Sequence, residues 1–438
     1  MPILSKQIVK LIIKNFLFNN PLSKKRLKTL EQRAAWNLDE LEKFQEQKIF
    51  DTLLSAKKKI PAYANIKIPS SYRGVKEFLR NEIPVISKSD LLENKKLYYP
   101  AKYPWVTVGR TSGTSGTPLE IFRSYNSVIW EKAFIKRHWS VAGIEFKRAT
   151  LRGDEVVSAS TKNPPFWHYT NNDQLVISSA HLKPNTIKNI INEIQSFNPS
   201  VLQAYPSTAF ILAEYLDKTD TVLSVKYVFT GSEMLYPYQR EVIEKTIGRV
   251  VDFYGMAERV AMATECIFGN LHVNMDYSYV EILDDNNLPT EGLGYVVGTT
   301  FHNSAMPLIR YKLSDMTKWK KGSCECGSHQ KMIEPISGKY EDRIYNGDNV
   351  AISPSLITFA FKGVSNIKMA QVAQINNNTW EVRVVPDDFF SGNDSSMILS
   401  NLKELVGNST DIKLKLVDDI PRTKAGKFRW VKNEFHTA

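Results

Sequence analysis

A short segment of glycine and hydroxyl residues, RTSGTSGTP at positions 110–118, has the composition of a loop that binds phosphate groups. Glycine lets backbone N–H groups approach a ligand closely, and serine and threonine hydroxyls donate hydrogen bonds to phosphate oxygens. The same residue types also form flexible linkers, because they make few packing contacts. The segment therefore predicts either a phosphate loop or a linker, and the rest of the chain must decide between them.

Polar residues also follow apolar runs that we expect to be strands. Ser232 and Glu233 follow VKYVFTG, and the segment VDFYGMAE places Tyr254 and Glu258 after two valines. Tyr254 offers a flat face for a purine, and the Glu258 carboxylate is a hard oxygen ligand suited to Mg²⁺. Open α/β sheets bind ligands at the C-terminal ends of their strands, so these positions are candidate nucleotide contacts. Each segment alone is equally typical of an ordinary turn.

Two further candidates come later in the chain. Asp315, in PLIRYKLSD, follows an expected strand, where its carboxylate can accept hydrogen bonds from both hydroxyls of a ribose. Lys427, in PRTKAGK, lies on a basic turn that contains a glycine. Its charge suits the neutralisation of a carboxylate and an α-phosphate while pyrophosphate leaves. A basic turn of this kind is otherwise an ordinary solvent-exposed segment.

The apolar periodicity predicts an α/β protein with two domains. Residues 1–95 are expected to be helical, and helices alternate with short strands from 126 to 260, which is typical of parallel sheet. Residues 270–320 predict antiparallel strands of a β-rich subdomain, and a small α+β unit follows. We place the boundary between a large N-terminal domain, 1–338, and a small C-terminal domain, 339–438. The length of 438 residues also favours more than one domain.

Composition limits the partners and the compartment. The net charge of +11 favours anionic partners, and no nucleic-acid-binding motif is present. Three cysteines do not indicate a disulfide framework, so a cytoplasmic setting is expected. The apolar N-terminal segment is interrupted by Lys6, Lys10 and Lys14 and is too short and charged to span a bilayer. It predicts a helix that docks on its own domain or contacts an anionic membrane surface.

The ordered set TSGTSGTP, GSE, DFYGMAE, GLGYVVGTTFHNSAMPLIRYKLSD, GKYEDRI and PRTKAGK resembles the adenylate-forming superfamily. Within it, the chain is similar to the phenylacetate–CoA ligase branch and its relatives in capsular-polysaccharide biosynthesis. The resemblance covers essentially the whole chain, and six motifs in one order are more specific than any one of them. It implies ATP-dependent activation of a carboxylate to an acyl-adenylate, and a small mobile C-terminal domain. It also favours the phosphate-loop interpretation of the first segment.

The resemblance implies roles for individual residues. The loop over the β- and γ-phosphates would comprise Ser112, Gly113, Thr114, Ser115, Gly116 and Thr117. The adenine pocket would be lined by Ser232, Glu233, Asp252, Phe253 and Tyr254. Glu258 matches the magnesium-binding carboxylate, Asp315 the ribose-binding aspartate and Lys427 the adenylation lysine. Lys339 stands at the hinge where the family normally has arginine, so we expect weaker nucleotide contacts there, because lysine cannot form a bidentate fork.

A cysteine–histidine set predicts a zinc site. Cys266, His272, Cys324 and Cys326 supply three thiols and one imidazole, which suit tetrahedral zinc. Some relatives in the phenylacetate–CoA ligase branch carry a similar set, although the C-x-C spacing is tighter than in zinc fingers and His329 is a competing imidazole. Four protein ligands leave no open position, so the expected zinc is structural. The alternative is three free thiols.

The substrate and the acceptor are left open by the sequence. We expect an enzyme that uses ATP, Mg²⁺ and a small carboxylic acid, with an acyl pocket whose candidate lining is His138, Trp139, Trp167, His168 and Tyr205. The acyl acceptor is either coenzyme A or an amine or hydroxyl in surface polysaccharide biosynthesis. Two alternatives are an adenylyltransferase that releases its adenylated product and a catalytically inactive nucleotide-binding scaffold of a polysaccharide assembly complex. Intact Glu258, Asp315 and Lys427 argue against the scaffold.

Overall fold

In the computed structural model, the chain forms two compact units. Unit 1 comprises Met1–Glu145, Val251–Leu313 and Thr317–Pro335, and unit 2 comprises Phe146–Val250, Ser314–Met316 and Ile336–Ala438. The structure describes residues 21–100, 106–110, 119–143, 146–151, 156–157, 161–183, 185–339, 344–348, 351–352, 357–361, 364, 366–421 and 429–435. The predicted domain boundary between residues 338 and 339 stays a prediction.

The N-terminal part of unit 1 is helical, as the sequence predicts. Its helices are α2 (Pro21–Ala34), α3 (Leu38–Lys59), η1 (Pro61–Tyr63), α4 (Val75–Glu82), α5 (Lys88–Glu93), α6 (Lys95–Tyr98), α7 (Tyr125–Trp139) and η2 (Ser140–Ala142). Helix α3 begins with a capping box in which Asn37 and Glu40 each accept a hydrogen bond from the other's backbone N–H. Its buried residues Ile49 and Leu53 join a core with Tyr279 in the segment 278–283, which is a strand of the same unit, so the helix is fixed to the strands.

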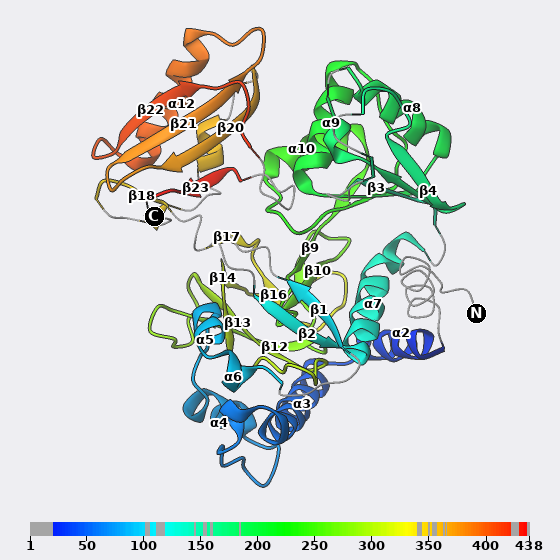
Figure 1. The fold of residues 1–438 in the computed structure, drawn as a ribbon, viewed down its shortest axis with the longest axis vertical. Helices are drawn as coiled ribbons and strands as arrows, with labels where there is room; N and C mark the ends of the chain where they lie inside the picture. The colour runs from blue at the N-terminus through cyan, green and yellow to red at the C-terminus, as the bar shows by residue number, and fades with distance from the viewer. Residues whose placement is uncertain are drawn as a thin grey trace, which may run out of the picture. The chain divides into compact units, whose positions relative to one another are not determined.

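The strands of unit 1 are antiparallel wherever their pairing is defined within the unit, in agreement with the prediction for residues 270–320. One hairpin comprises β1 (Val106–Arg110) and β2 (Glu120–Ser124). A five-stranded sheet has the order β15 (Trp319–Lys320), β16 (Met332–Ile333), β11 (Leu271–Val273), β10 (Met262–Glu265) and β9 (Phe253–Gly255). A four-stranded sheet has the order β12 (Ser278–Leu283), β13 (Gly294–Thr300), β14 (Tyr311–Thr317) and β17 (Ser337–Lys339), labelled in Figure 1; β17 and residues Ser314–Met316 of β14 are counted with unit 2.

Unit 2 contains the predicted parallel sheet. Its order is β4 (Trp167–Asn171), β5 (Gln174–Ile177), β3 (Arg148–Leu151), β6 (Val201–Ala204), β7 (Tyr227–Phe229) and β8 (Arg249–Val251). The pairs β3–β5, β3–β6 and β6–β7 are parallel, and β4 is an antiparallel edge strand. Three helices share its core, α8 (Ile187–Phe197), α9 (Pro206–Lys218) and α10 (Pro237–Thr246), and the short segment η3 (Ser179–His181) precedes α8. This alternation of strands and helices confirms the α/β class.

The C-terminal part of unit 2 is α+β, as predicted. Its elements are β18 (Ile344–Tyr345), β19 (Ala351–Ile352), η5 (Thr358–Phe361), β20 (Ile367–Gln374), β21 (Thr379–Pro386), α12 (Gly392–Val406), β22 (Asp411–Leu416) and β23 (Val431–Asn433). Four of the strands form a sheet in the order β22-β21-β20-β23, and α12 packs on it (Figure 1). The fully buried Trp380 lies in the core between them.

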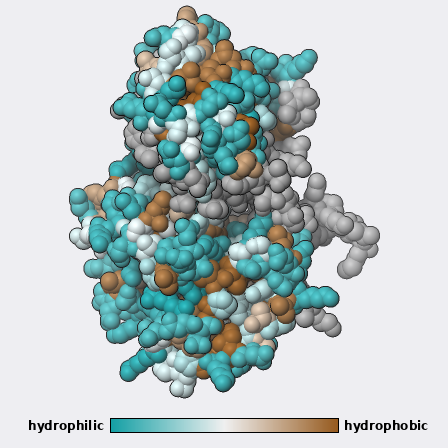
Figure 2. Space-filling view, turned by 90° about the vertical axis from the view of Figure 1, so that its left-hand side faces the viewer, coloured by the Kyte–Doolittle hydropathy of each residue, from teal (hydrophilic) through white to brown (hydrophobic). Residues whose placement is uncertain are grey.

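No helix in the described part of the chain is long and apolar enough to cross a membrane. On the face shown in Figure 2, hydrophilic side chains cover most of the surface, and apolar side chains form separate groups between them. Residues 1–20 lie outside the described residues, so the membrane contact of the N-terminal helix and the cytoplasmic setting stay predictions.

A buried ion pair joins the four-stranded sheet to helix α4. The Arg310 Nε donates to Glu281 at 3.1 Å, and the Arg310 Nη1 donates to the carbonyls of Arg80 at 3.0 Å and Ile83 at 2.8 Å. Both Arg310 and Glu281 are buried. Burial raises the pKa of Glu281, and the neighbouring Arg310 opposes that shift. The guanidinium therefore satisfies a carboxylate and two backbone carbonyls in a region that excludes water.

Replacing Arg310 by methionine is expected to destabilise unit 1 strongly, because the buried Glu281 carboxylate would lose its hydrogen-bonded partner and keep only the half-exposed Arg80 at 3.7 Å. Loss of one partner of a buried pair costs about 3–5 kcal/mol in the free energy of unfolding. Urea unfolding would measure this change. Lys321→Met is the matched control, because Lys321 and its partner Glu291 are both exposed, and exposed pairs contribute about 0–1 kcal/mol. Equal losses of unfolding free energy in the two variants would contradict the stabilising role of the buried Arg310–Glu281 pair.

Candidate functional site

The turn between β9 and β10 in unit 1 carries the predicted adenine and magnesium residues. Phe253 and Tyr254 belong to β9, and Glu258 lies in the turn that follows. Within the turn, the Arg259 N–H donates to the Met256 carbonyl at 3.2 Å, and Arg259 has a left-handed backbone with φ of +59°. A left-handed conformation at a non-glycine residue is costly, and it recurs at ligand-binding positions.

A close backbone contact holds this turn against β13. A Cβ added to Gly298 of β13 would lie 2.1 Å from the Val260 carbonyl oxygen, two residues after Glu258. Any side chain at position 298 would therefore displace the end of the turn. Nothing in the local sequence marks this role of Gly298, because it depends on Val260, which lies 38 positions earlier in the chain.

The first residue of the adenine motif is fixed by a pair of hydrogen bonds. The Asp252 N–H donates to the Glu265 carboxylate at 2.5 Å, and the Glu265 N–H donates to the Asp252 carbonyl at 3.1 Å. Glu265 is buried. These bonds close the open end of the β9–β10 hairpin, so the main chain on both sides of the turn is held in register.

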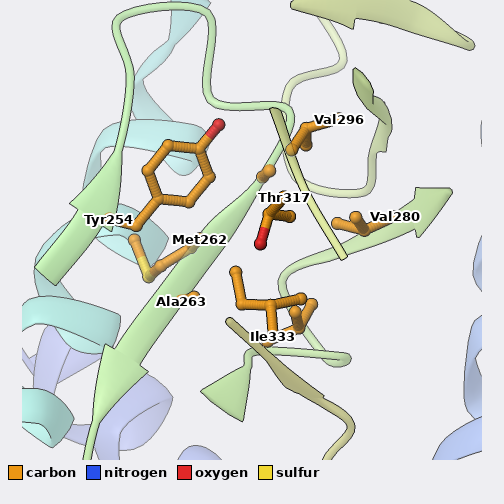
Figure 3. Close-up of a pocket in the computed structure, with 9 residues that line it drawn as sticks. Tyr254, Met262, Ala263, Val280, Val296, Thr317 and Ile333 are labelled. Atoms are coloured by element: carbon orange, nitrogen blue, oxygen red, sulfur yellow. The ribbon is translucent and has the colours of Figure 1, made fainter. Parts of the chain in front are cut away.

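Tyr254 lies at the wall of a small apolar pocket inside unit 1 (Figure 3). Its ring lies close to Met262, and its hydroxyl points away from the Thr317 hydroxyl. The pocket is lined by Tyr254, Ala261, Met262, Ala263, Val273, Val280, Val296, Thr317 and Ile333. Nearly all of these side chains are apolar, so one face of the tyrosine ring has an apolar support, as a purine-stacking residue requires.

Glu258 is surrounded by polar groups from other elements. The buried Tyr311 hydroxyl lies 3.5 Å from the Glu258 Oε1. The Arg123 guanidinium on β2 is close enough for the Glu258 charge to affect it. Burial lowers the pKa of Arg123, and the neighbouring Arg259 lowers it further, while Glu131 opposes the shift. Neither side chain was assigned a role from the sequence: Arg123 lies outside the motifs, and Tyr311 lies in the motif that ends at Asp315 but contacts Glu258 only in the folded chain.

Ser232 and Glu233, the other predicted adenine contacts, follow β7 in unit 2. Ser232 has a left-handed backbone with φ of +71°. A carboxylate oxygen of Glu233 accepts a hydrogen bond at 3.1 Å from the N–H of Ser207, near the start of α9. Because β6 and β7 are parallel neighbours, α9 and the Glu233 turn begin at the same edge of the sheet. Glu233 thus has a structural contact as well as its predicted binding role, since a carboxylate stabilises a helix N-terminus.

The predicted ribose aspartate lies on a strand, and its exposure is low. Asp315 belongs to β14, is 9% exposed and faces Lys339 of β17 in the strand register. The register shifts between Asp315 and Met316, which marks a bulge. Bulges redirect side chains next to binding sites. Only the backbone of Lys339 is described.

Two predicted elements lie outside the described residues. They are the loop Ser112, Gly113, Thr114, Ser115, Gly116 and Thr117, and the adenylation lysine Lys427. Their roles stay predictions from the sequence.

The aromatic candidates for the acyl pocket differ in their surroundings. His138 of α7 is buried, and its ring lies 5.7 Å from that of Phe253 in unit 1. Burial lowers the pKa of His138 to about 3, so its imidazole is neutral and packs as a core residue. In unit 2, Tyr205 precedes the first turn of α9, while Trp167 and the exposed His168 lie on the edge strand β4. Their contact with substrate stays a prediction.

The four predicted zinc ligands are gathered in unit 1. The ligand atoms of Cys266, His272, Cys324 and Cys326 all lie within 4.8 Å of one another. Cys266 follows β10, His272 lies on β11, and the C-x-C pair lies in the loop between β15 and β16. The competing His329 is exposed and lies outside this group. The tertiary structure thus selects His272, which the sequence left open.

The distances within this cluster match those expected around a tetrahedral metal. The sulfurs of Cys266 and Cys324 are 3.6 Å apart, and the Cys326 sulfur lies 3.3 Å from the His272 Nε2. Zn–S bonds of about 2.3 Å at tetrahedral angles place two sulfurs about 3.8 Å apart. All three cysteines are free thiols. The donor set therefore fits zinc without a rearrangement of the backbone.

Groups around the cluster also prepare its ligands. The His272 Nδ1–H donates to the Gln330 carbonyl at 3.2 Å, which leaves the Nε2 lone pair directed at the cluster. Hydrogen bonds from Cys326 and from Asn270 outweigh the effect of burial and lower the pKa of Cys324, whereas burial raises the pKa of Cys326. A low thiol pKa favours the thiolate, which is the form that binds metals.

Comparison with known proteins gives matches along most of the chain. The family model described as the CapK C-terminal domain matches residues 344–434. Protein CapK of Staphylococcus aureus is 25% identical over 366 residues, which cover 81% of this chain and 80% of that protein. The phenylacetate-coenzyme A ligase of Thermus thermophilus is 24% identical over 331 residues, covering 71% of this chain and 73% of that enzyme. The phenylacetate-coenzyme A ligase of Escherichia coli is 23% identical over 436 residues, covering 89% and 94%.

Solved structures share the fold. A 2-hydroxyisobutyryl-CoA ligase in its postadenylation state matches with a TM-score of 0.70 and 18% identity, over 92% of both chains. An anthranilate CoA ligase in complex with anthranoyl-AMP matches with a TM-score of 0.54 and 13% identity, over 74% of this chain and 64% of that one. At these identities the structural likeness shows the fold alone.

The fold and the sequence relatives together define an adenylate-forming enzyme, an AMP-forming ligase. The chain is similar to the phenylacetate–CoA ligase-like branch of the adenylate-forming superfamily, and its residues 344–434 match the CapK C-terminal domain. The predicted family, fold class and class of enzyme are therefore confirmed.

Proposed function

We propose that the chain activates a small carboxylic acid with ATP to an acyl-adenylate and transfers the acyl group to coenzyme A. The observation that carries this proposal is the β9–β10 hairpin. Tyr254 lies on β9 and Glu258 lies four residues later in the turn, so one rigid hairpin holds both side chains. An aromatic face and a carboxylate at this spacing suit a purine and a Mg²⁺ ion bound to its phosphates. The named activity of the phenylacetate-coenzyme A ligase relatives supports coenzyme A as the acceptor.

Each proposed contact has a distinct chemical role. Glu258 would hold Mg²⁺, whose charge offsets that of the triphosphate. Tyr254 would stack on the adenine, and Asp315 would accept hydrogen bonds from the ribose. Lys427 would place its ammonium group where negative charge develops as the carboxylate attacks the α-phosphate and pyrophosphate leaves. Residues 112–117 would donate backbone and hydroxyl hydrogen bonds to the β- and γ-phosphates.

A second candidate acceptor is an amine or hydroxyl of a surface glycan. It is supported by the match of residues 344–434 to the CapK C-terminal domain and by the similarity to Protein CapK over most of the chain. The first half-reaction would be the same, because acyl-adenylate formation does not depend on the acceptor. The two candidates therefore differ only in which nucleophile releases AMP.

A screen of carboxylic acids tests the proposed function. We expect one group of acids to give ATP–pyrophosphate exchange and to release AMP faster when coenzyme A is added, with the thioester detected by mass spectrometry. Exchange without any effect of coenzyme A would favour the glycan acceptor. An adenylated product that accumulates in solution would instead indicate an adenylyltransferase. ATP binding without exchange for any acid would contradict the proposal and favour an inactive scaffold.

The role of Lys427 is tested by its replacement with alanine. We expect acid-dependent pyrophosphate exchange to fall by about 100-fold or more, because a group that stabilises developing charge is lost. Lys424→Ala is the matched control, since it removes one positive charge from the same turn, and it should retain most of the exchange. Undiminished exchange in Lys427→Ala would exclude the assigned role.

We also infer that Cys266, His272, Cys324 and Cys326 bind a structural zinc ion. Support comes from their common location and from the match of their spacing to a tetrahedral site. The ion would join the Cys266 turn to the Cys324–Cys326 loop, whose residues are 58 positions apart. A four-ligand site has no open position for substrate, so we assign it to stability.

Metal analysis of the purified protein tests the zinc proposal. We expect about one zinc ion per chain, as four protein ligands form one closed site. Cys324→Ser should lose the zinc and lower the melting temperature, because metal binding contributes directly to folding. His329→Ala should keep both, since His329 is exposed and outside the cluster. A zinc-free protein of unchanged stability would show that the cluster consists of free thiols.

A further inference from the structure

We propose that Arg123 is a positioning residue that fixes the Glu258 turn to the β1–β2 hairpin and thereby sets the affinity for the metal–nucleotide complex. Arg123 lies outside the sequence motifs of the candidate site. The proposal rests on the proposed function, because it takes Glu258 as the Mg²⁺ ligand. It concerns only residues of unit 1.

The Arg123 guanidinium joins two elements that are far apart in the sequence. Its Nη2 donates to the Ala257 carbonyl, the residue immediately before Glu258. Arg123 lies on β2, one residue after Phe122 and one before Ser124, both of which are bonded to Asn303. Asn303 donates to the Phe122 carbonyl at 2.8 Å and accepts from the Ser124 N–H at 3.2 Å. Arg123 therefore lies on a strand whose main chain is fixed on both sides by hydrogen bonds to the buried Asn303.

A glycine on the partner strand makes room for this contact. Gly109 and Arg123 lie on the same face of the hairpin, because Thr107 pairs with Arg123 and Gly109 with Ile121. A Cβ at Gly109 would lie 2.2 Å from the Arg123 Cζ and 2.4 Å from its Nη2. The guanidinium thus crosses the backbone at Gly109 on its way to Ala257, and any side chain at position 109 would displace it.

The neighbouring charges explain why this donor is directed at a carbonyl. The carboxylate that lies nearby, Glu131, is engaged by the Arg259 Nε at 3.5 Å and by the Tyr277 hydroxyl at 2.6 Å. Tyr277 is buried and Glu131 is only slightly exposed, so this group is well shielded from water. Arg259 thus follows Glu258 and is fixed to α7 through Glu131, while Arg123 fixes the residue that precedes Glu258.

The two arginines therefore hold the turn from both sides. With the carbonyl of residue 257 bound to Arg123 and the side chain of residue 259 bound to Glu131, the backbone of Glu258 has little freedom. A preorganised carboxylate binds a metal more tightly than a mobile one, because less ordering is required on binding. Loss of Arg123 should therefore lower the affinity for Mg²⁺ and leave the affinity for the carboxylic acid unchanged.

A double-mutant cycle tests the proposal with the full-length chain. The variants are Arg123→Ala, Gly109→Ala and the two combined, with Arg73→Ala as a control that removes an exposed arginine. The readouts are the Mg²⁺ concentration for half-maximal pyrophosphate exchange, the KM for the acid, and direct binding of Mn²⁺ in the presence of ATP. Melting temperature and circular dichroism show whether each variant is folded.

We expect Arg123→Ala and Gly109→Ala each to raise the half-maximal Mg²⁺ concentration about tenfold, the size of effect typical of groups that orient a metal ligand. The KM for the acid should not change, which separates positioning from a general loss of structure. The combined variant should be no worse than Arg123→Ala, because the new Cβ then meets no guanidinium. Arg73→Ala should behave as the unaltered chain.

Three outcomes would overturn the proposal. They are an unchanged metal affinity in folded Arg123→Ala, an equal rise in the KM for the acid, and a Gly109→Ala effect that is as large without Arg123 as with it. If Arg123→Ala does not fold, Gly109→Ala and Arg123→Lys carry the test through the same metal readout. If no acid supports exchange, the proposed function fails, and Mn²⁺ binding in the presence of ATP still decides the role of Arg123.

Discussion

The contact between the β9–β10 turn and β13 is the constraint on which the candidate nucleotide site depends. The Val260 carbonyl lies so close to Gly298 that no side chain fits between them. This contact fixes the depth of the turn, and the hydrogen bonds between Asp252 and Glu265 fix its register. Tyr254 and Glu258 then extend from a hairpin whose two ends cannot move independently. A binding site built on such rigid elements holds its groups in place before the ligand arrives.

Several buried ionic groups of unit 1 are paired with a group of opposite charge. Arg310 neutralises Glu281, Arg137 forms two hydrogen bonds of 2.9 Å with the fully buried Asp276, and Arg259 lies beside Glu131. Burial of a charge without a partner is costly, so these pairs leave few alternatives for the packing of the helices on the strands. The cysteine–histidine cluster at the other end of β10 and β11 has the same effect on the loops.

Much of the architecture follows from local sequence patterns. The five apolar residues of α8 recur at helical spacing, and the short strands VLQA and YVF alternate with helices, which is how a parallel sheet is built. The nucleotide motifs were recognisable because their residues are close together in the chain. The roles of Arg123, Tyr311 and Gly298 were not, because each contacts a residue that lies 38 to 134 positions away in the sequence.

The sequence by itself determined the family, the α/β class and the chemical types available at the site, because these depend on residue identity and short-range order. Only the tertiary structure decided which imidazole joins the three thiols: His272 on β11 does so and His329 does not, since strand pairing brings β11 beside the loop that carries Cys324 and Cys326. It also decided that Arg123 reaches the residue before Glu258 across Gly109. These contacts join segments that are far apart in the sequence, so no local pattern predicts them. They form because close packing leaves a single arrangement for the side chains.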